Sequence, residues 1–210
     1  MTPGRLVEVV QELAADWQYD AISIGYPGLV GSNGPRSEPG NLGPGWVGFD
    51  YSAALGKPVR IINDAAMQAL GSYEGGRMLF LGLGTGLGSA LIVRNVLITL
   101  ELGCLPFAEG QVLSDVLGKK GLERFGKKSW RAIIADVVPK LMGAFSADDV
   151  VIGGGNAKEV KVLPPGTRLG HNLTAFRGGF RLWHVDDVST QTTGGGLPDA
   201  ARQPAEWRLI

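Results

Sequence analysis

Residues 78–93 read MLFLGLGTGLGSALIV. Two apolar runs, 78–83 and 89–93, are joined by the glycine-rich residues 84–88. Glycine readily adopts the positive φ that tight turns require, and apolar runs on both sides of such a turn are typical of a β-hairpin. The glycine loop is therefore expected to close a hairpin and not to open a helix.

Further elements flank this hairpin in an alternating order. Short apolar runs predict strands at 21–25, 58–62 and 150–152, and amphipathic or helix-prone segments predict helices at 4–17, 65–70 and 129–145. Alternating strands and helices predict an α/β fold that binds ligands at the carboxyl ends of its strands.

Two stretches carry no expected element. Residues 31–48 contain three prolines and are expected to form a long loop, which in a compact domain is usually functional. Trp46 in this loop is interpreted as a packing anchor. The polar stretch 189–210 is expected to be a loose tail outside the fold.

Composition excludes several classes of function. Lys plus Arg and Asp plus Glu both count 20, so no excess of one sign favours nucleic acid or an anionic membrane. The N-terminus lacks the apolar run of a signal peptide, which predicts a cytoplasmic protein. Cys104 is the single cysteine, so neither an internal disulfide nor a structural zinc site is expected.

The polar side chains of Asn63 and Asp64, at the end of an expected strand, have two possible roles. Asp64 could act as a general base that takes a proton from a substrate hydroxyl, with Asn63 bonding a neighbouring hydroxyl. Alternatively, they could cap a helix, because Asp and Asn are favoured N-cap residues and a helix is expected directly after them. The dipeptide alone leaves both readings open.

Two glycine turns are also candidate sites. Gly84, Thr85 and Gly86 could cradle a phosphate with backbone N–H groups and the threonine hydroxyl, or they could form an ordinary hairpin turn. A dinucleotide-binding motif needs a helix after the loop, which disfavours a nicotinamide-dependent oxidoreductase, and a P-loop needs a Gly-Lys-Ser or Gly-Lys-Thr that is missing here. The second turn could pack against a flat ring or start a helix; it comprises Gly153, Gly154, Gly155 and Asn156.

Taken in order, these motifs resemble the ROK family of sugar kinases, near its polyphosphate/ATP glucokinase branch. The similar segments are residues 24–30, 41–46, 62–65, 83–88, 101–104, 153–157 and 178–183. The resemblance implies the actin-like, ribonuclease H-like α/β fold of two lobes. It divides the chain into 1–70, from the N-terminal lobe, 71–188, the C-terminal lobe, and the tail at 189–210.

The resemblance also implies a role for each candidate residue. Asp64 would be the catalytic base, and Gly84, Thr85 and Gly86 would face the transferred phosphoryl group. The nucleotide side would be Gly153, Gly154, Gly155 and Asn156, and the sugar side would be Asn41, Asn63, Glu101 and Cys104. A hexose such as glucose, Mg²⁺ with ATP or polyphosphate, and a homodimer are expected.

The chain departs from the family pattern in three places. The family's first strand, with its Asp-Gly-Gly-Thr-like phosphate loop, would precede Met1, so the N-terminal lobe is expected to be incomplete and the activity weak. Cys104 stands where the family has a sugar-binding histidine, and Ser114 where it has a glutamate. A thiol or hydroxyl gives no charge-assisted hydrogen bond. The alternative to a kinase is therefore an impaired protein that binds sugar or nucleotide without turnover.

Overall fold

The computed structural model describes residues 1–40, 42–108, 110–187 and 207–209. The chain forms two compact units, Met1–Asp64 and Ala65–Ile210. No helix in the described part of the chain combines the length and the apolar composition that a bilayer crossing requires. The boundary between the two units was expected near residue 70 and lies at Asp64, because the helix that begins there packs in the second unit.

The first unit is built on a parallel pair of strands. Its elements in chain order are α1 (Pro3–Leu13), β1 (Ile22–Tyr26), β2 (Val30–Gly31), β3 (Gly34–Pro35), α2 (Tyr51–Leu55) and β4 (Val59–Asn63). β1 pairs with β4 in parallel, from Ile22 beside Val59 to Tyr26 beside Asn63. Among the described strands, β1 pairs with β4 alone. The homodimer that the family resemblance implies stays a prediction.

Strands β1 and β4 of this unit were predicted, but the short β2–β3 pair at the start of the expected loop was not, and the first helix is shorter than expected. Thr2 caps α1, which ends at Leu13 instead of continuing to residue 17. Trp17 is 71% exposed, and its N–H donates to the Ala14 carbonyl in a turn. Because the last expected helical turn would bury no large side chain, tertiary packing does not stabilise it.

Aromatic side chains and one carboxylate fix the path of the loop at 31–48. Tyr26, Trp46 and Tyr51 are buried together, and the Tyr26 and Trp46 ring centroids lie 5.8 Å apart. The Trp46 indole donates to the Gly43 carbonyl at 2.6 Å, which confirms Trp46 as a packing anchor. Glu38 accepts the backbone N–H groups of Trp46 at 3.1 Å and Val47 at 3.3 Å. These bonds lower the pKa of Glu38, and burial raises the pKa of Tyr51 to about 12.

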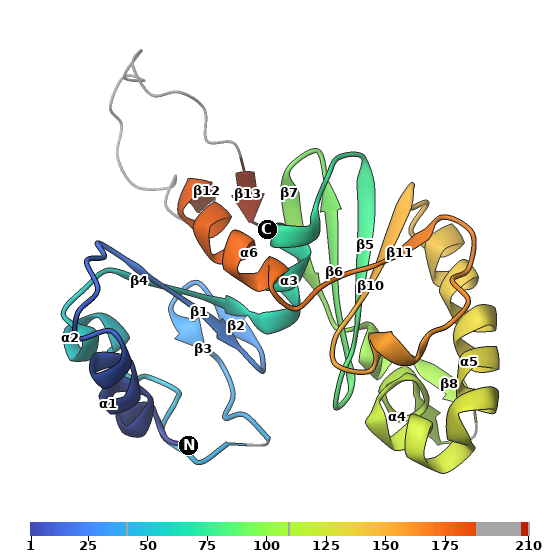
Figure 1. Cartoon of the computed structure of the whole chain (residues 1–210), viewed down its shortest axis with the longest axis horizontal. Coiled ribbons are helices and arrows are strands. Elements are labelled where there is room, and N and C mark those ends of the chain that lie inside the picture. The colour runs from blue at the N-terminus through green and yellow to red at the C-terminus, as the bar shows by residue number, and fades with distance from the viewer. Residues whose placement is uncertain (41, 109, 188–206, 210) are drawn as a thin grey trace. The chain divides into compact units, whose positions relative to one another are not determined.

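The second unit is built on a mixed sheet with the order β11-β10-β5-β6-β7-β13-β12 (Figure 1). Its strands are β5 (Arg77–Leu83), β6 (Leu87–Val93), β7 (Val96–Leu100), β10 (Asp149–Gly153), β11 (Thr167–Leu169), β12 (Val185–Asp187) and β13 (Trp207–Leu209). β5 and β6 are antiparallel, with Gly82 opposite Gly88, so the predicted hairpin is confirmed. β10 runs parallel to β5.

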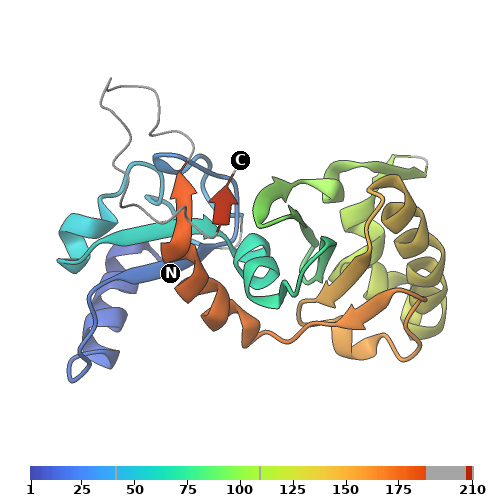
Figure 2. The ribbon, with the colours of Figure 1, turned by 90° about the horizontal axis from the view of Figure 1, so that it is seen from above.

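Helices cover both faces of this sheet (Figure 2). α5 (Lys119–Ala144) packs on one face, where Trp130 and Ile134 belong to the same buried cluster as Leu79 and Leu81 of β5. It includes residues 129–144 of the helix predicted at 129–145, begins ten residues earlier, and is interrupted at Gly126, whose φ is 71°. The short elements around it are η1 (Leu102–Cys104), β8 (Pro106–Ala108), β9 (Gln111–Val112), α4 (Leu113–Leu117) and η2 (Ala157–Glu159).

α3 (Asp64–Ser72) and α6 (Thr174–Arg181) lie side by side on the other face (Figure 1), and η3 (Leu182–His184) follows α6. Two glycines bring their backbones together. A Cβ on Gly71 would lie 1.8 Å from the Thr174 carbonyl oxygen, and a Cβ on Gly178 would lie 1.9 Å from that of Met67. α3 is thus packed into the second unit, which is why the division falls at Asp64 and not at residue 70.

The C-terminal stretch differs from the expected loose tail at one point. Residues 188–206 lie outside the described residues, but Trp207–Leu209 forms β13 between β7 and β12. Trp207 is 3% exposed and packs edge-on against Tyr73, with ring centroids 5.2 Å apart. The Arg181 guanidinium lies 5.2 Å from the Trp207 ring. Burial of one large aromatic side chain stabilises this strand in a mostly polar stretch.

We predict that Gly71→Ala destabilises the second unit by about 3 kcal/mol, because the added methyl group collides with backbone and the two helices must separate. Gly143→Ala is the matched control: its Cβ would meet no atom within 4 Å, and alanine favours a helix interior by up to about 1 kcal/mol. Thermal denaturation of both variants tests the contact. Equal melting temperatures for the two would contradict it.

We predict that Glu38→Gln removes a pH dependence of the loop at 31–48. The pKa of Glu38 is lower in the folded protein than in the unfolded chain. The stability that ionised Glu38 adds is therefore complete above the unfolded-state pKa, and it is lost as the pH falls through the folded-state pKa. The Trp46 indole N–H, followed by NMR from pH 7 to 3, should report this loss in the wild type but not in the variant. Glu12→Gln is the control, and identical profiles for wild type and Glu38→Gln would refute the role.

Candidate functional site

The tip of the β5–β6 hairpin, residues 84–86, forms the Gly84 loop. The Gly84 N–H donates to the Gly82 and Gly86 carbonyls, both at 3.1 Å. The Gly84 carbonyl accepts the backbone N–H of Lys119 at 2.9 Å. Thr85, at the apex, is exposed. The loop thus presents an accessible hydroxyl on a backbone fixed from behind, as a phosphate cradle requires.

The predicted nucleotide turn lies against this loop. Asn156 donates its side-chain amide to the Gly84 carbonyl at 3.0 Å and its backbone N–H to the Leu83 carbonyl at 2.9 Å. Gly154 has a φ of 82°, and a Cβ there would lie 2.6 Å from the Leu83 oxygen. Gly153 is buried and Gly155 is exposed. Two motifs about 70 positions apart in the sequence therefore form one structure within the second unit.

A third segment supports the Gly84 loop, and the sequence reasoning assigned it no such role. The Ser114 hydroxyl accepts the Leu87 N–H at 3.2 Å. Gly118, between α4 and α5, packs so closely that a Cβ would lie 2.7 Å from the Thr85 carbonyl. Ser114 was considered only as the replacement of a family glutamate, yet its hydroxyl holds the hairpin. A lone glycine between two helical segments was the only signal for Gly118.

The sugar-side segment at Glu101–Cys104 is anchored next to the same hairpin. The buried Ser89 hydroxyl donates to the Leu100 carbonyl at 2.9 Å and accepts the Leu102 N–H at 3.0 Å. A Cβ on Gly103 would lie 2.9 Å from the Leu87 carbonyl. Glu101 and Cys104 themselves are exposed, so both can meet a ligand. Sequence reasoning missed Ser89, whose only signal was a polar residue in an apolar strand.

The remaining predicted residues belong to the first unit. Asn63, at the end of β4, donates its side-chain amide to the Gly28 carbonyl at 3.2 Å and so holds the Pro-Gly turn after β1. Asp64 is the first residue of α3 and is exposed. A carboxylate in the first turn of a helix is stabilised by the helix dipole, so both the base and the cap readings stay open. Asn41 lies outside the described residues.

Within the described residues no group of three or more His, Cys, Asp or Glu side chains could hold a metal ion. A magnesium ion needs fewer protein ligands than such a group, because it keeps several waters and is usually bound through one or two carboxylates together with substrate phosphates. The lack of such a group among the described residues is therefore compatible with a metal that enters with a phosphate compound.

Comparison with known proteins shows related sequences. No family model matches the chain. Polyphosphate glucokinase of Mycobacterium leprae is 27% identical over 176 residues, which cover 75% of this chain and 53% of that protein. The chain therefore spans about half the length of this curated relative.

Solved structures with the same fold extend the comparison. The inorganic polyphosphate/ATP-glucomannokinase of Arthrobacter sp. strain KM superposes with a TM-score of 0.73 at 24% identity, over 86% of this chain and 81% of that one. A ROK family transcriptional regulator, a homologue of the E. coli MLC protein, gives 0.60 at 16% identity, over 86% and 67%. The chain is therefore similar in sequence to a polyphosphate glucokinase, and it has the fold of the glucomannokinase and of the ROK family regulator.

Proposed function

We propose that this chain transfers a phosphoryl group from ATP or polyphosphate to a hydroxyl of glucose or a related hexose. The observation that carries the proposal is the bond from Asn156 to the Gly84 carbonyl, which unites the expected phosphate and nucleotide motifs in one rigid structure. The names of the similar proteins, a polyphosphate glucokinase and a polyphosphate/ATP-glucomannokinase, support the same reaction.

The Gly84 loop takes the transferred phosphoryl group in this proposal. Its glycines leave the backbone open to close approach, and the exposed Thr85 hydroxyl donates a hydrogen bond to a phosphoryl oxygen. Phosphoryl transfer depends mainly on positioning and on charge stabilisation, so a loop fixed by three neighbouring segments suits it. Gly153, Gly154 and Gly155, with Asn156, form the turn that accepts the nucleotide when ATP is the phosphate donor.

The proposal assigns the sugar side to Asp64, Asn63, Glu101, Asn41 and Cys104. Asp64 takes the proton of the attacking sugar hydroxyl while the new oxygen–phosphorus bond forms and the bond to the leaving phosphate breaks. Asn63 and Glu101 bind other hydroxyls. A magnesium ion bound with the phosphates would neutralise the charge of the leaving group.

A second candidate function is binding of a sugar or nucleotide without turnover. The exposed thiol of Cys104 favours it, because a thiol binds a sugar hydroxyl more weakly than the imidazole that the family resemblance implies there. The fold shared with a transcriptional regulator is compatible with binding alone. Calorimetric binding of glucose without product in a coupled assay would favour this candidate.

We predict that Asp64→Asn lowers hexose phosphorylation by about 10²- to 10⁴-fold, because the amide still suits a helix start but cannot accept the proton. Coupled assays with ATP and with polyphosphate, across several hexoses, measure the effect. Asp16→Asn, at another exposed aspartate, is the control and should keep full activity. Turnover near the wild-type rate in Asp64→Asn would eliminate Asp64 as the base.

We predict that Thr85→Ala weakens phosphate-donor binding more than sugar binding, by about 1.5 to 3 kcal/mol for the lost bond to a charged oxygen. Thr85→Ser keeps the hydroxyl but lacks the methyl group, so it should bind the phosphate donor as the wild type does. If the methyl group mattered only for packing, Thr85→Ser would lose binding as well. Calorimetry with ATP, polyphosphate and glucose separates the effects. Equal losses for sugar and phosphate donor would indicate a structural turn instead.

A further inference from the structure

Gly88 is a strand glycine to which the proposed reaction gives no role. It is the second residue of β6, shortly after the Gly84 loop, and its neighbour across the hairpin is Gly82. Glycine inside a strand weakens the strand and often marks a place where another backbone comes close. Because opposite residues of a hairpin present their side chains on the same face, two opposite glycines leave that face open at this point.

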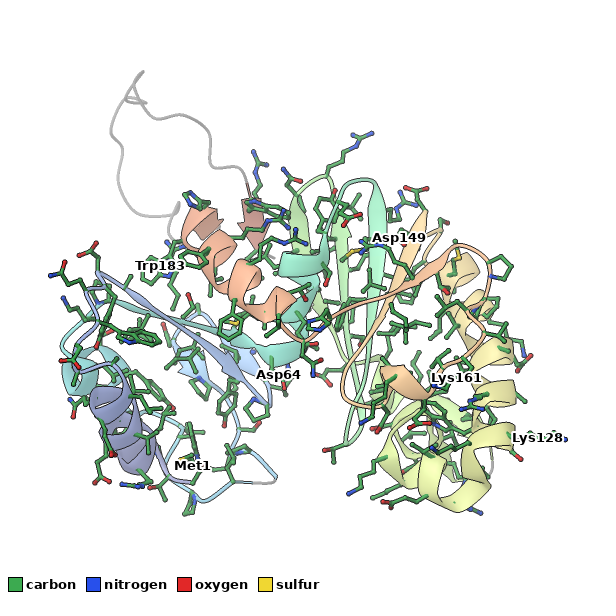
Figure 3. The ribbon with its side chains drawn as sticks, viewed as in Figure 1. Met1, Asp64, Lys128, Asp149, Lys161 and Trp183 are labelled. Carbon is green, nitrogen blue, oxygen red and sulfur yellow. The ribbon has the colours of Figure 1, made fainter. Side chains whose placement is uncertain are left out.

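The first turn of α3 occupies the space that these glycines leave. A Cβ on Gly88 would lie 2.6 Å from the Ala65 Cβ, and a Cβ on Gly82 would lie 3.9 Å from the same atom. Ala65 is buried in this contact, with 5% of its surface exposed. Asp64, the proposed base, is the first residue of α3 (Figure 3) and is joined to Ala65 by one peptide bond. The helix turn that carries Asp64 therefore rests on the strands that carry the Gly84 loop.

The other end of α3 is held by arginine side chains. The last carbonyls of a helix have no partner within the helix, and cations near them are favourable to the helix dipole. Here each carbonyl of residues 70–73 accepts a hydrogen bond from an arginine: Arg181 donates to Leu70 at 2.6 Å and to Tyr73 at 3.0 Å, Arg177 to Gly71, and Arg168 to Ser72 at 2.7 Å. Sliding of α3 along the sheet would break these bonds.

A helix fixed at one end responds to a push at the other end by tilting. Two carbon atoms in ordinary contact lie about 3.6 Å apart, so a methyl group on Gly88, at 2.6 Å from the Ala65 Cβ, would push the first turn of α3 away by about 1 Å. The carbonyls of residues 70–73 stay bonded to their arginines. The displacement is therefore largest at Asp64, the residue farthest from the fixed end.

We propose that Gly88 is a positioning residue for phosphoryl transfer: it seats Ala65 on the hairpin and so gives Asp64 a fixed position relative to the phosphoryl group at the Gly84 loop. The inference rests on the proposed function, because that function makes Asp64 the base and places the phosphoryl group at the loop. A misplacement of a reacting group by about 1 Å can cost about 10²-fold in rate. Gly88 therefore acts on the rate of transfer and not on the affinity for sugar or phosphate donor.

The test exchanges one methyl group between the two positions. In Gly88→Ala the new methyl group meets the Ala65 Cβ, whereas in the double variant Gly88→Ala, Ala65→Gly its nearest neighbour is the Cα of residue 65, at 4.0 Å. In coupled assays with ATP and glucose, kcat should fall about 10²-fold in Gly88→Ala, with both KM values within about twofold of the wild type. The double variant should regain most of the rate. Ala65→Gly alone reports the effect of a glycine in the helix, and Gly143→Ala, whose Cβ would meet no atom within 4 Å, is the control for an added methyl group.

A second measurement needs no turnover. The NMR resonance of the Asp64 carboxyl carbon should shift when tripolyphosphate binds to the full chain, because a nearby polyanion changes the electric field at the carboxylate. The shift should fall by about half or more in Gly88→Ala and return in the double variant. Arg181→Gln, which removes the donor to two carbonyls at the far end of α3, should reduce the shift as well. This variant decides the question if Gly88→Ala does not fold.

Three results would overturn the proposal: an unchanged kcat in folded Gly88→Ala, a rise in KM that accounts for the whole loss, or an Asp64 resonance in the wild type that does not respond to bound tripolyphosphate. The first two would leave Gly88 a purely structural glycine. The proposed function fails separately, because the resonance requires no turnover. A chain that forms no sugar phosphate, but whose Asp64 resonance responds to tripolyphosphate and depends on Gly88, loses the proposed function and keeps the positioning of Asp64.

Discussion

The candidate site depends on one carbonyl group, that of Gly84. It accepts hydrogen bonds from the Lys119 backbone at 2.9 Å and from the Asn156 side chain at 3.0 Å, and so joins the β5–β6 hairpin to α5 and to the turn after β10. A buried or half-buried acceptor with two partners is costly to disrupt, because both N–H groups would lose their bonds together. The turns expected to bind phosphate and nucleotide are therefore joined directly to each other. The proposed reaction needs such a connection, since its catalysis is mainly positioning.

Much of this arrangement follows from the sequence, because short-range chemistry determines it. The apolar runs around residues 84–88 specify a hairpin, and the strands at β1, β4 and β10 follow from their apolar composition. The glycines at 84, 86 and 154 mark places where a close approach to the backbone is expected; the structure shows backbone against backbone at Gly154, and at Gly86 the close neighbour is the Ser114 side chain. Three glycine or acidic strand ends define the candidate site, which stays a prediction.

Other features depend on contacts between distant residues and could not be predicted. Ser89 and Ser114 are ordinary serines in sequence, and their value as anchors arises only when β7 and α4 lie beside the hairpin. The division of the chain at Asp64 follows from the close contact of Gly71 with α6, more than 100 positions away. Trp207 lies in a mostly polar stretch, and its edge-on contact with the distant Tyr73 ring could not be predicted from that stretch.

The most direct test of the account is hydrogen exchange with and without tripolyphosphate, which occupies the proposed phosphate site but carries no base or sugar. The account predicts that residues 83–87, 118–119 and 153–157 gain protection together, because the Gly84 carbonyl couples them. Protection of the Gly84 loop alone, with no change around Lys119 and Asn156, would contradict a single rigid site. Protection only at segments outside these three would contradict the assignment of the phosphate site itself.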